Sequence, residues 1–460
     1  MILPVVLWSD ILIFALAIAV GLFVWQVRKN PLAKARWRTV FENKVGVTSF
    51  VIILFYVLIS LVDSLHFREP LPQLEGENAS DKVAYSSEVK SVLDLVLVNL
   101  EEGAETTYSA PFALYSFAKE NMTAEDGTVY RDFPRLENGG SHLADEADHL
   151  WDIFGKSIQA ILVGLIIGFI PVALHMWLRK RAGNTEDYIP WNVAYGTFIA
   201  LVVISTWILM VSEYYHILGT DKVGQDVLYQ SIKAIRTGVL IGTLATLVTL
   251  PIAIVLGISA GYFKGWVDDT VQFIYTTLSS IPGILLIAAS VLLIDVYIET
   301  NPEAFNLTIL RSDFKFIALC AILGLISWTT LCRLLRAETL KVSQLDYVQA
   351  AHAFGVSHSG VIRKHILPNV THIILISVVL DFSAFVLAEA VLSYIGVGVD
   401  PNMHSWGNMI NAARSELSRD PSVWWSVTSA FILMFTLVLA ANLFSDEVRN
   451  AFDPRTAKGN

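Results

Sequence analysis

Nine stretches of the sequence are apolar over enough length to cross a lipid bilayer. The hydrocarbon core of a membrane is about 30 Å thick, so a helix needs roughly 20 apolar residues to span it. Lipid offers no hydrogen-bond partners to the backbone, and only helices and closed barrels meet that constraint. We therefore predict an all-α, polytopic helical membrane protein with about nine transmembrane helices. The stretches cover residues 4–25, 45–62, 158–178, 193–211, 237–261, 270–294, 316–331, 370–395 and 423–444.

The composition agrees with this class of protein and excludes others. Hydrophobic residues make up 54% of the 460 residues and charged residues only 16%, whereas soluble domains carry about 25% charged residues. The sequence lacks the basic patch or stripe that marks a nucleic-acid binder, so we expect no nucleic-acid partner. Cys320 and Cys332 share one apolar stretch and are too few for a disulfide framework or a metal site.

The formal net charge of -10 comes from one segment of the chain. Residues 63–156 contain 19 acidic and 7 basic residues and carry -12, while the remaining 23 acidic and 25 basic residues sum to +2. Solvated surface charge is the default interpretation of this acidic loop, which is long enough for a small helical domain. Helical spacing within it predicts an amphipathic helix with the apolar positions Val89, Val92, Leu93, Val96, Leu97 and Leu100.

Basic residues in the short connections determine the expected orientation, because Lys and Arg stay on the cytoplasmic side. They concentrate in residues 28–44, 179–181 and 333–364 and in the C-terminal tail. Nine crossings then put the N-terminus outside, the C-terminus in the cytoplasm, and the acidic loop outside. Residues 1–8 lack the basic region of a signal peptide, so we expect the first stretch to remain as a span.

A short helix with small side chains is predicted on the cytoplasmic side, between the seventh and eighth stretches. It comes from the sequence Asp346-Tyr-Val-Gln-Ala-Ala-His-Ala-Phe-Gly355, where the glycine suits a left-handed helix cap. Further on, Pro368 suits the first turn of the next helix. Small residues let another protein approach closely, but a helix that packs on its own bundle would show the same pattern. The spacing alone leaves both interpretations open.

This segment resembles the Glu-Ala-Ala loop of ABC importer permeases, whose helix docks into a cleft on the cytoplasmic ATPase subunit. Three more segments follow the order expected for the dipeptide/oligopeptide/nickel permease family. Residues 216–228 resemble its opening motif, and residues 388–410 resemble its late motif. The residues that resemble its closing signature are Asn442, Asp446, Arg449, Asp453, Pro454 and Arg455. The likeness covers residues 216–455 and implies a type I ABC importer permease core.

The resemblance assigns roles to particular residues. The residues that would couple to an ATPase are Tyr347, Val348, Gln349, Ala350, Ala351, Phe354, Gly355 and Pro368. The residues of the opening motif are Gly219, Thr220, Asp221 and Asp226. Two positions depart from the family pattern, since Gln349 stands where Glu is usual and Gln225 where Arg is usual. An exposed ion pair is worth roughly 0–1 kcal/mol, so we expect coupling to survive the first change.

The resemblance also implies partners and a location. It implies a heterodimer with a homologous second permease, two cytoplasmic ABC ATPase subunits, and an extracytoplasmic solute-binding protein that delivers a peptide-like cargo. The location would be the inner membrane of a bacterium, with lipid around the spans. ATP and Mg would bind the ATPase subunits, and this chain would hold no cofactor, metal or catalytic residue. The cargo stays open among dipeptides, longer or antimicrobial peptides, oligosaccharides and nickel.

The likeness divides the chain into four regions. Residues 1–62 are two N-terminal spans with a basic cytoplasmic connection, residues 63–156 are the acidic extracytoplasmic insertion, and residues 157–215 are an inserted transmembrane hairpin. The permease core covers residues 216–455, with the cytoplasmic coupling loop near residues 333–368. The insertion and the hairpin have no counterpart in the family core.

Two carboxylates fall inside the eighth stretch, where an ionised carboxylate costs about 2.5–3.5 kcal/mol. Asp381 and Glu389 lie about 80° apart around a helix. They are expected to line or gate the translocation path, or to lock neighbouring helices together, and both interpretations remain open. For Leu218–Asp221 we favour the cap and membrane anchor of a helix over residues 227–236, with direct substrate contact as the alternative.

Three other functions remain as alternatives. A membrane sensor or scaffold would use the acidic extracytoplasmic domain, and its permease core would not transport. A secondary transporter would be driven by ions and usually contains inverted repeats, which we do not find in the sequence. An enzyme would need a catalytic constellation, which we also do not find. Cargo-specific, ATP-dependent uptake separates an importer from a sensor.

Overall fold

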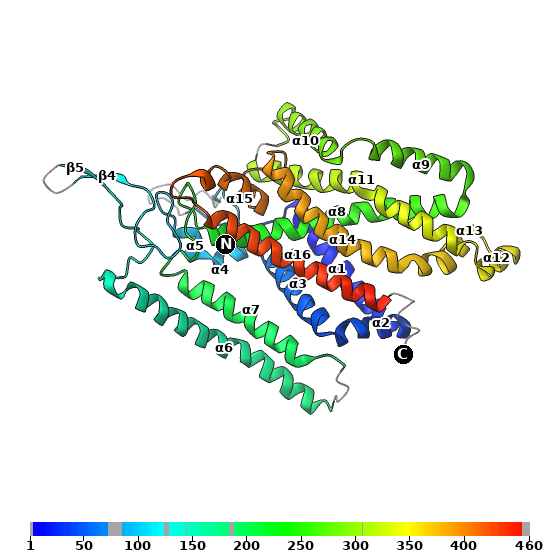
Figure 1. Cartoon of the computed structure of the whole chain (residues 1–460), viewed down its shortest axis with the longest axis horizontal. Coiled ribbons are helices and arrows are strands. Elements are labelled where there is room, and N and C mark those ends of the chain that lie inside the picture. The colour runs from blue at the N-terminus through cyan, green and yellow to red at the C-terminus, as the bar shows by residue number, and fades with distance from the viewer. Residues whose placement is uncertain are drawn as a thin grey trace, which may run out of the picture. The chain divides into compact units, whose positions relative to one another are not determined.

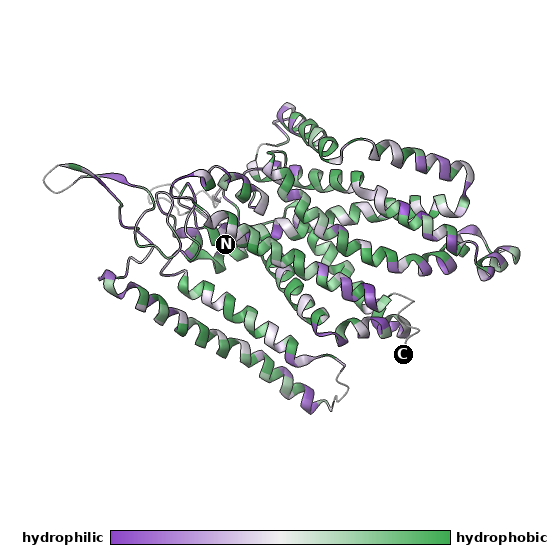
Figure 2. Cartoon of the chain, viewed as in Figure 1, coloured by the Kyte–Doolittle hydropathy of each residue, from purple (hydrophilic) through white to green (hydrophobic). Residues whose placement is uncertain are grey.

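The structure is a computed structural model that describes residues 3–71, 85–123, 128–143, 145–183, 188–305 and 307–452. In these ranges nine helices are long and apolar enough to cross a membrane, which confirms the predicted all-α, multi-pass class. Figure 1 shows these helices, and in Figure 2 hydrophobic residues run along their lengths while hydrophilic residues gather in the connections. The nine are α1 (Trp8–Lys29), α3 (Lys44–Asp63), α6 (His149–Arg181), α7 (Trp191–Val211), α8 (Val227–Phe263), α10 (Gly283–Thr300), α11 (Thr308–Val342), α14 (Leu367–Tyr394) and α16 (Trp425–Phe452).

Shorter elements lie in the connections. The short α-helices are α2 (Pro31–Glu42), α4 (Val92–Val96), α5 (Val98–Glu102), α9 (Gly265–Ser279), α12 (Asp346–Ala353), α13 (His358–Val361) and α15 (Trp406–Ala413). Single turns of other helix types are η1 (Glu146–Asp148), η2 (Ile362–Ile366) and η3 (Glu416–Ser418). The strands form two antiparallel sheets, β1–β2–β3 and β4–β5, from β1 (Leu3–Val5), β2 (His66–Arg68), β3 (Lys90–Ser91), β4 (Glu120–Thr123) and β5 (Val129–Asp132).

Of two predicted spans that contain an internal proline, one differs from the structure there and the other does not. The stretch over residues 270–294 is not one helix, because Pro282 lacks an N–H group and separates α9 from α10. Of this pair, α10 is the helix that is long and apolar enough to span. By contrast, α8 continues through Pro251, and the separate helix expected over residues 227–236 is its first part.

The chain forms two compact units, and each is described by itself. The first unit is drawn from residues 1–13, 47–237 and 403–437, and the second from residues 14–46, 238–402 and 438–460.

In the first unit, the described part of the acidic insertion is not the small helical domain that its length suggested. It contains two short helices, irregular segments and strands, and β4 and β5 pair as a hairpin. The predicted amphipathic helix is split into α4 and α5. Half of its predicted apolar face is buried, because Leu93, Leu97 and Leu100 pack against α3, α7 and α8, whereas Val96 is 50% exposed. The insertion is therefore anchored on helices of the membrane bundle.

In the second unit, small residues let α8, α11 and α14 pack closely. At Gly324 of α11, a β-carbon would lie 2.5 Å from Val248 Cβ and 2.7 Å from the Ala245 carbonyl oxygen. Gly242 of α8 faces the Phe382 ring of α14 in the same way. Lipid supplies no hydrophobic driving force between helices, so close contact at small residues is what holds such a bundle together.

Two of the short helices are attached to spans of the same unit. Val40 of α2 is buried against Val448 and Phe452 of α16. The Arg336 guanidinium of α11 donates two hydrogen bonds, of 2.5 and 2.7 Å, to the Asp268 carboxylate of α9. These contacts fix the positions of α2 and α9 on the second unit.

Replacing Gly324 with alanine should destabilise the protein, because the added β-carbon overlaps α8. Overpacking costs about 1–3 kcal/mol, so the midpoint of thermal unfolding in detergent should fall. Gly196→Ala in α7 is the matched control, because nothing lies within 4 Å of a β-carbon there and a helix favours alanine over glycine by about 0.5–1 kcal/mol. Equal midpoints for Gly324→Ala and the wild type would show that α8 and α11 do not pack as described.

Candidate functional site

The predicted coupling helix is present as α12, and most of its side chains lie on the surface. Phe354 is 88% exposed and Tyr347 is 46% exposed. The other exposed residues of the predicted coupling set are Gln349, Ala350, Gly355 and Pro368. Ala351 is half-buried. Exposed aromatic side chains beside small residues form a surface that suits a groove on another protein.

The helix is held in place from beneath and at its end. Val348 is buried in one apolar cluster with Val342, so its side chain faces the bundle and not a partner. Gly355 has a φ of +79°, the left-handed conformation that the predicted cap requires. Of the two interpretations of this helix, packing on the chain's own bundle fits Val348, and contact with another protein fits its exposed neighbours.

Two further contacts fix the coupling segment. The Asn369 side-chain amide donates a hydrogen bond of 3.0 Å to the Tyr347 hydroxyl and joins α12 to the start of α14. The Gln349 side-chain amide donates a bond of 3.1 Å to the Gln344 carbonyl oxygen. Pro368 lies in the first turn of α14, as predicted.

The two carboxylates of α14 have different surroundings. Glu389 is buried and accepts a hydrogen bond of 2.7 Å from the Ser393 hydroxyl, one turn further along the helix. Asp381 is half-buried, and its Oδ2 atom is buried without a hydrogen-bond partner among the described residues. An unsatisfied carboxylate in a membrane span is costly and is a candidate for function. Asp381 is therefore the stronger functional candidate of the pair.

The opening motif leads directly into α8, and Asp226 caps this helix. The Asp226 Oδ1 atom accepts hydrogen bonds from the N–H groups of Leu228 and Tyr229, at 2.8 and 3.1 Å. The cap had been expected at Thr220 or Asp221, and that expectation is wrong. Thr220 and Asp226 are both buried.

The rest of the opening motif is a tight loop. Asp221 shapes it, because its Oδ1 atom accepts hydrogen bonds from the N–H groups of Val223 and Gln225. Gly219 and Gly224 have φ values of +65° and +80°, and a β-carbon at either position would collide with a backbone carbonyl oxygen of the insertion. Glycine is therefore required at both positions.

The acidic insertion covers this loop. The Thr220 hydroxyl accepts a hydrogen bond of 2.7 Å from the Ser109 N–H and donates one of 2.8 Å to the Thr107 carbonyl oxygen. From the start of α16, Trp425 Nε1 donates a bond of 2.9 Å to the Thr220 carbonyl oxygen. Thr220 thus serves to join the insertion to the opening motif, and its hydroxyl does not face solvent.

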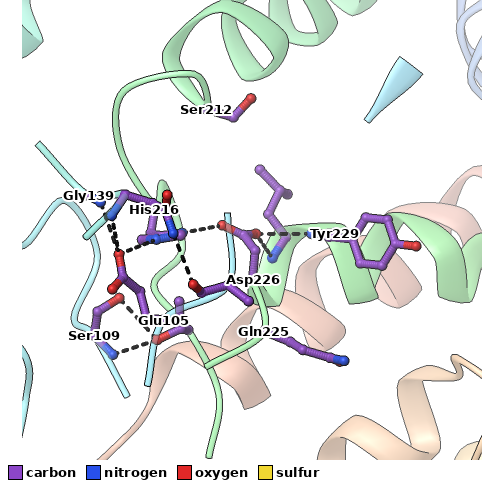
Figure 3. A network of polar contacts seen from close by, with 12 residues as sticks. Glu105, Ser109, Gly139, Ser212, His216, Gln225, Asp226 and Tyr229 are labelled. Atoms are coloured by element: carbon purple, nitrogen blue, oxygen red, sulfur yellow. Dashed lines mark hydrogen bonds and ion pairs between the residues drawn. The ribbon is translucent and has the colours of Figure 1, made fainter. Parts of the chain in front are cut away.

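His216 links the insertion to the cap of α8 (Figure 3). Its Nδ1 atom lies 2.9 Å from Asp226 Oδ2, and its Nε2 atom lies 3.3 Å from Glu105 Oε1. All three side chains are buried. Burial alone would lower the pKa of His216, but the hydrogen bonds and negative charges of Asp226 and Glu105 outweigh it and raise the pKa to about 9. His216 is therefore a buried cation between two carboxylates.

Glu105 organises the insertion around His216. Its Oε1 atom accepts hydrogen bonds from the N–H groups of Asn138 and Gly139, at 2.8 and 3.1 Å, and its Oε2 atom accepts one of 3.0 Å from Glu137. Burial raises the pKa of Glu105, but the bond from His216 and these backbone N–H groups together bring it below its ordinary value. The carboxylate stays ionised opposite the cation.

Sequence reasoning missed Glu105 and His216 as site residues. Glu105 is one of 19 acidic residues in the segment 63–156, and nothing in the local sequence distinguishes it. His216 stands in the segment that resembles the opening motif, but no spacing rule joins it to a residue 111 positions away. The sequence did place His216 and Asp226 in the same motif, and a contact between these two side chains could have been predicted from that.

The late motif and the closing signature lie on the C-terminal helices. Residues 388–410 cover the end of α14 and the first part of α15. Asn442, Asp446 and Arg449 are on α16, whereas residues 453–455 lie outside the described residues.

One family model and several known proteins match part of the chain. The model described as "binding-protein-dependent transport system inner membrane component" matches residues 253–458, which include α12 and α14. The oligopeptide transport system permease protein of Mycobacterium tuberculosis is 32% identical over 239 residues, 52% of this chain and 76% of that protein. The glutathione transport system permease protein of Pectobacterium atrosepticum is 30% identical over 240 residues, 52% of this chain and 73% of that protein. The dipeptide transport system permease protein of Lactococcus lactis is 29% identical over 243 residues, 53% of this chain and 65% of that protein.

The charge on His216 gives the stability a defined pH dependence. A pKa raised to about 9 stabilises the folded chain fully below the ordinary value of 6.5, and this contribution shrinks as the pH rises and is lost above about 9. A shift of this size corresponds to about 3 kcal/mol. Thermal unfolding of the wild type should therefore occur at a higher temperature than that of His216→Gln near pH 6, and the two midpoints should converge near pH 10.

The charge on Glu105 does not interfere with this test. Its lowered pKa gives a contribution that is present above the ordinary value of 4.5 and is lost as the pH falls further, outside the tested window. A difference between the two midpoints that stays constant across the window would contradict a charged His216.

Proposed function

Because the chain belongs to the family of binding-protein-dependent transport inner membrane components, we propose that it is the permease subunit of an ATP-driven importer of peptides. It is a multi-pass membrane protein. Permeases of this family are translocation components and not enzymes, so ATP hydrolysis belongs to separate subunits.

The exposed helix α12 carries this proposal, and it lies within the part of the chain that the family model matches. It connects two membrane-spanning helices, α11 and α14, through short segments. Phe354 is exposed at its end while Val348 anchors it from beneath. We assign α12 the role of docking into a cytoplasmic ATPase subunit. Closure of that subunit on ATP would move α12 and the helices joined to it, and this links two distinct sites.

The proposed assembly contains a homologous second permease, two cytoplasmic ATPase subunits and an extracytoplasmic solute-binding protein. The family description names dependence on a binding protein. A peptide cargo is supported by relatives named for oligopeptides, glutathione and dipeptides. ATP and Mg would bind the ATPase subunits and not this chain. Residues 216–455 would form the permease core, and residues 63–156 and 157–215 would be insertions without a counterpart in it.

The proposed orientation in a bacterial inner membrane has the N-terminus outside and the C-terminus in the cytoplasm. The direction rests on the basic residues of the short connections. Two contacts agree with the grouping of the connections into two sides, although they do not depend on which side is the cytoplasm. Outside, Phe117 of the insertion and Trp425 at the start of α16 meet edge to face at 5.1 Å between ring centroids. In the cytoplasm, Val40 of α2 shares a cluster with Phe452 at the end of α16.

Phe354→Ser should uncouple the importer without unfolding it, because the exposed side chain supports no packing. In proteoliposomes that contain the complete complex, the wild type should accumulate a labelled oligopeptide only with ATP. Loss of an aromatic anchor should weaken ATPase association, and with it uptake, about tenfold or more. Trp151→Ser is the matched control, since it removes a 75% exposed aromatic side chain from α6. Uptake without ATP, or full ATPase association of Phe354→Ser, would contradict the assignment.

Asp381→Asn tests whether this carboxylate lines the translocation path. We propose that it meets a positively charged group of the peptide, because its buried Oδ2 atom has no partner among the described residues. Loss of a charge-assisted hydrogen bond should reduce uptake about tenfold, while the copurified subunits stay unchanged. Glu389→Gln is the control, because its amide oxygen can still accept the bond from Ser393. Loss of subunit assembly in Asp381→Asn would instead identify a lock between helices.

A further inference from the structure

Two cations on the first turns of α8, the largely buried Lys233 and the buried Arg236, face acidic residues from outside the permease core. The side chains of Lys233 and Arg236 are 11% and 8% exposed. Three residues apart, they are neighbours on the surface of one helix. A buried ammonium or guanidinium group is tolerated when an anion neutralises it. The partners of these two side chains therefore decide whether this part of α8 can be buried.

Lys233 is neutralised by the insertion and by the end of α3. Its Nζ atom lies 2.5 Å from Asp63 Oδ1 and 2.8 Å from Asp94 Oδ1. Asp94 is itself fixed, because it forms a capping box with Ser91 at the start of α4. Its Oδ1 atom also accepts a hydrogen bond of 2.9 Å from the Tyr229 hydroxyl. Since Tyr229 lies one turn before Lys233, Asp94 holds two successive turns of α8.

Arg236 is neutralised by the N-terminal segment. Its Nη2 atom lies 2.7 Å from Asp10 Oδ1 in the first turn of α1, and its Nε atom donates a bond of 3.0 Å to the Ser64 hydroxyl. The other oxygen of Asp10 accepts a bond of 3.0 Å from the Leu7 N–H and lies 2.9 Å from His66 Nδ1. The N-terminal segment is thus bound to α8 by the same type of contact as the insertion.

A third contact of this type acts on the loop before α8. Glu105 holds His216, and the other nitrogen of His216 holds the carboxylate that caps the helix. The anions of the three contacts come from outside residues 216–455 and are Asp10, Asp63, Asp94 and Glu105. The cations come from inside those residues and are His216, Lys233 and Arg236.

Solvated surface charge does not explain this arrangement. Exposed acidic residues of the insertion, such as Glu88, Glu102 and Asp132, remain in solvent, where ion pairs contribute little. The buried acids instead converge on one helix start and the loop before it. The buried acids Asp10, Asp63, Asp94 and Glu105 all lie outside residues 216–455, the part of the chain that resembles the permease family.

We propose that the acidic insertion and the N-terminal segment form a brace that fixes the opening motif and the first turns of α8 for transport. Asp94 and Glu105 are positioning residues of this brace, because they act through the side chains of α8 and of the loop before it. A test of this brace by transport rests on the proposed importer function, whereas a test by hydrogen–deuterium exchange does not.

Neutral variants of similar size test whether the ion pairs act as a brace or only as surface charge. Lys233→Met leaves the buried Asp63 and Asp94 facing each other without a cation, and Asp63→Asn with Asp94→Asn leaves a largely buried ammonium without an anion. Each should reduce ATP-driven peptide uptake by the complete complex about tenfold or more, since each leaves a buried charge unpaired. The variant with all three changes should recover most of the uptake. Glu102→Gln removes one exposed charge from the insertion and should transport like the wild type.

Hydrogen–deuterium exchange of the same complexes tests the contact through His216. Glu105→Gln removes the charge that faces His216, but Glu105 makes no hydrogen bond to the capped N–H groups of Leu228 and Tyr229. In the brace, these two amides should exchange about tenfold or more faster in Glu105→Gln than in the wild type, because the cap is held through His216. Glu102→Gln should leave their exchange unchanged.

The outcomes distinguish the two proposals. Wild-type uptake by Lys233→Met together with wild-type exchange in Glu105→Gln would overturn the brace, as would a triple variant that transports less than Lys233→Met. A wild-type complex that moves no peptide with ATP would overturn the importer proposal. In that case the exchange rates at residues 228–229 still decide whether the brace exists.

Discussion

Pairing of buried charges sets the start of α8, and the surrounding first unit depends on it. Removing one partner of a buried ion pair costs about 3–5 kcal/mol, which is a large share of the 5–15 kcal/mol, roughly, that stabilises a typical folded protein. Two of the anions are also held by hydrogen bonds within the insertion. A capping box holds Asp94, and three backbone N–H groups hold Glu105. The insertion must therefore fold correctly for α8 to begin where it does.

The second unit relies on close packing and not on charge. Val348 of α12 belongs to the same buried cluster as Ala253 of α8, Cys332 of α11 and Val370 of α14. Tightly packed interiors transmit displacement because their side chains have little free space. A helix that is exposed on one side and built into this cluster on the other suits a coupling element, and the proposed contact of Phe354 with an ATPase subunit would use that property.

The sequence predicted the features that local chemistry determines. Apolar length predicted the nine spans of the described residues, and Gly355 and Pro368 predicted a helix end and a helix start. The sequence shows that Pro282 interrupts the stretch over residues 270–294, but because apolar residues continue on both sides, the stretch was predicted as one span and not as two helices. The contact of Glu105 with His216 was not predicted, for a different reason. It joins residues 111 positions apart, and one buried carboxylate looks like any other acidic residue in a loop of charge -12.

The decisive measurement is hydrogen–deuterium exchange of the wild-type complex in a membrane, without ATP and with ATP trapped on the ATPase subunits. The amides of residues 137–139 and 228–229 are bonded to the buried carboxylates of Glu105 and Asp226, so they should remain protected in both states. The amides of α12 should change their protection when ATP is bound. Rapid exchange at residues 228–229 in either state, or identical exchange of α12 in both, would contradict a permease whose added segments brace α8 while α12 couples to ATP.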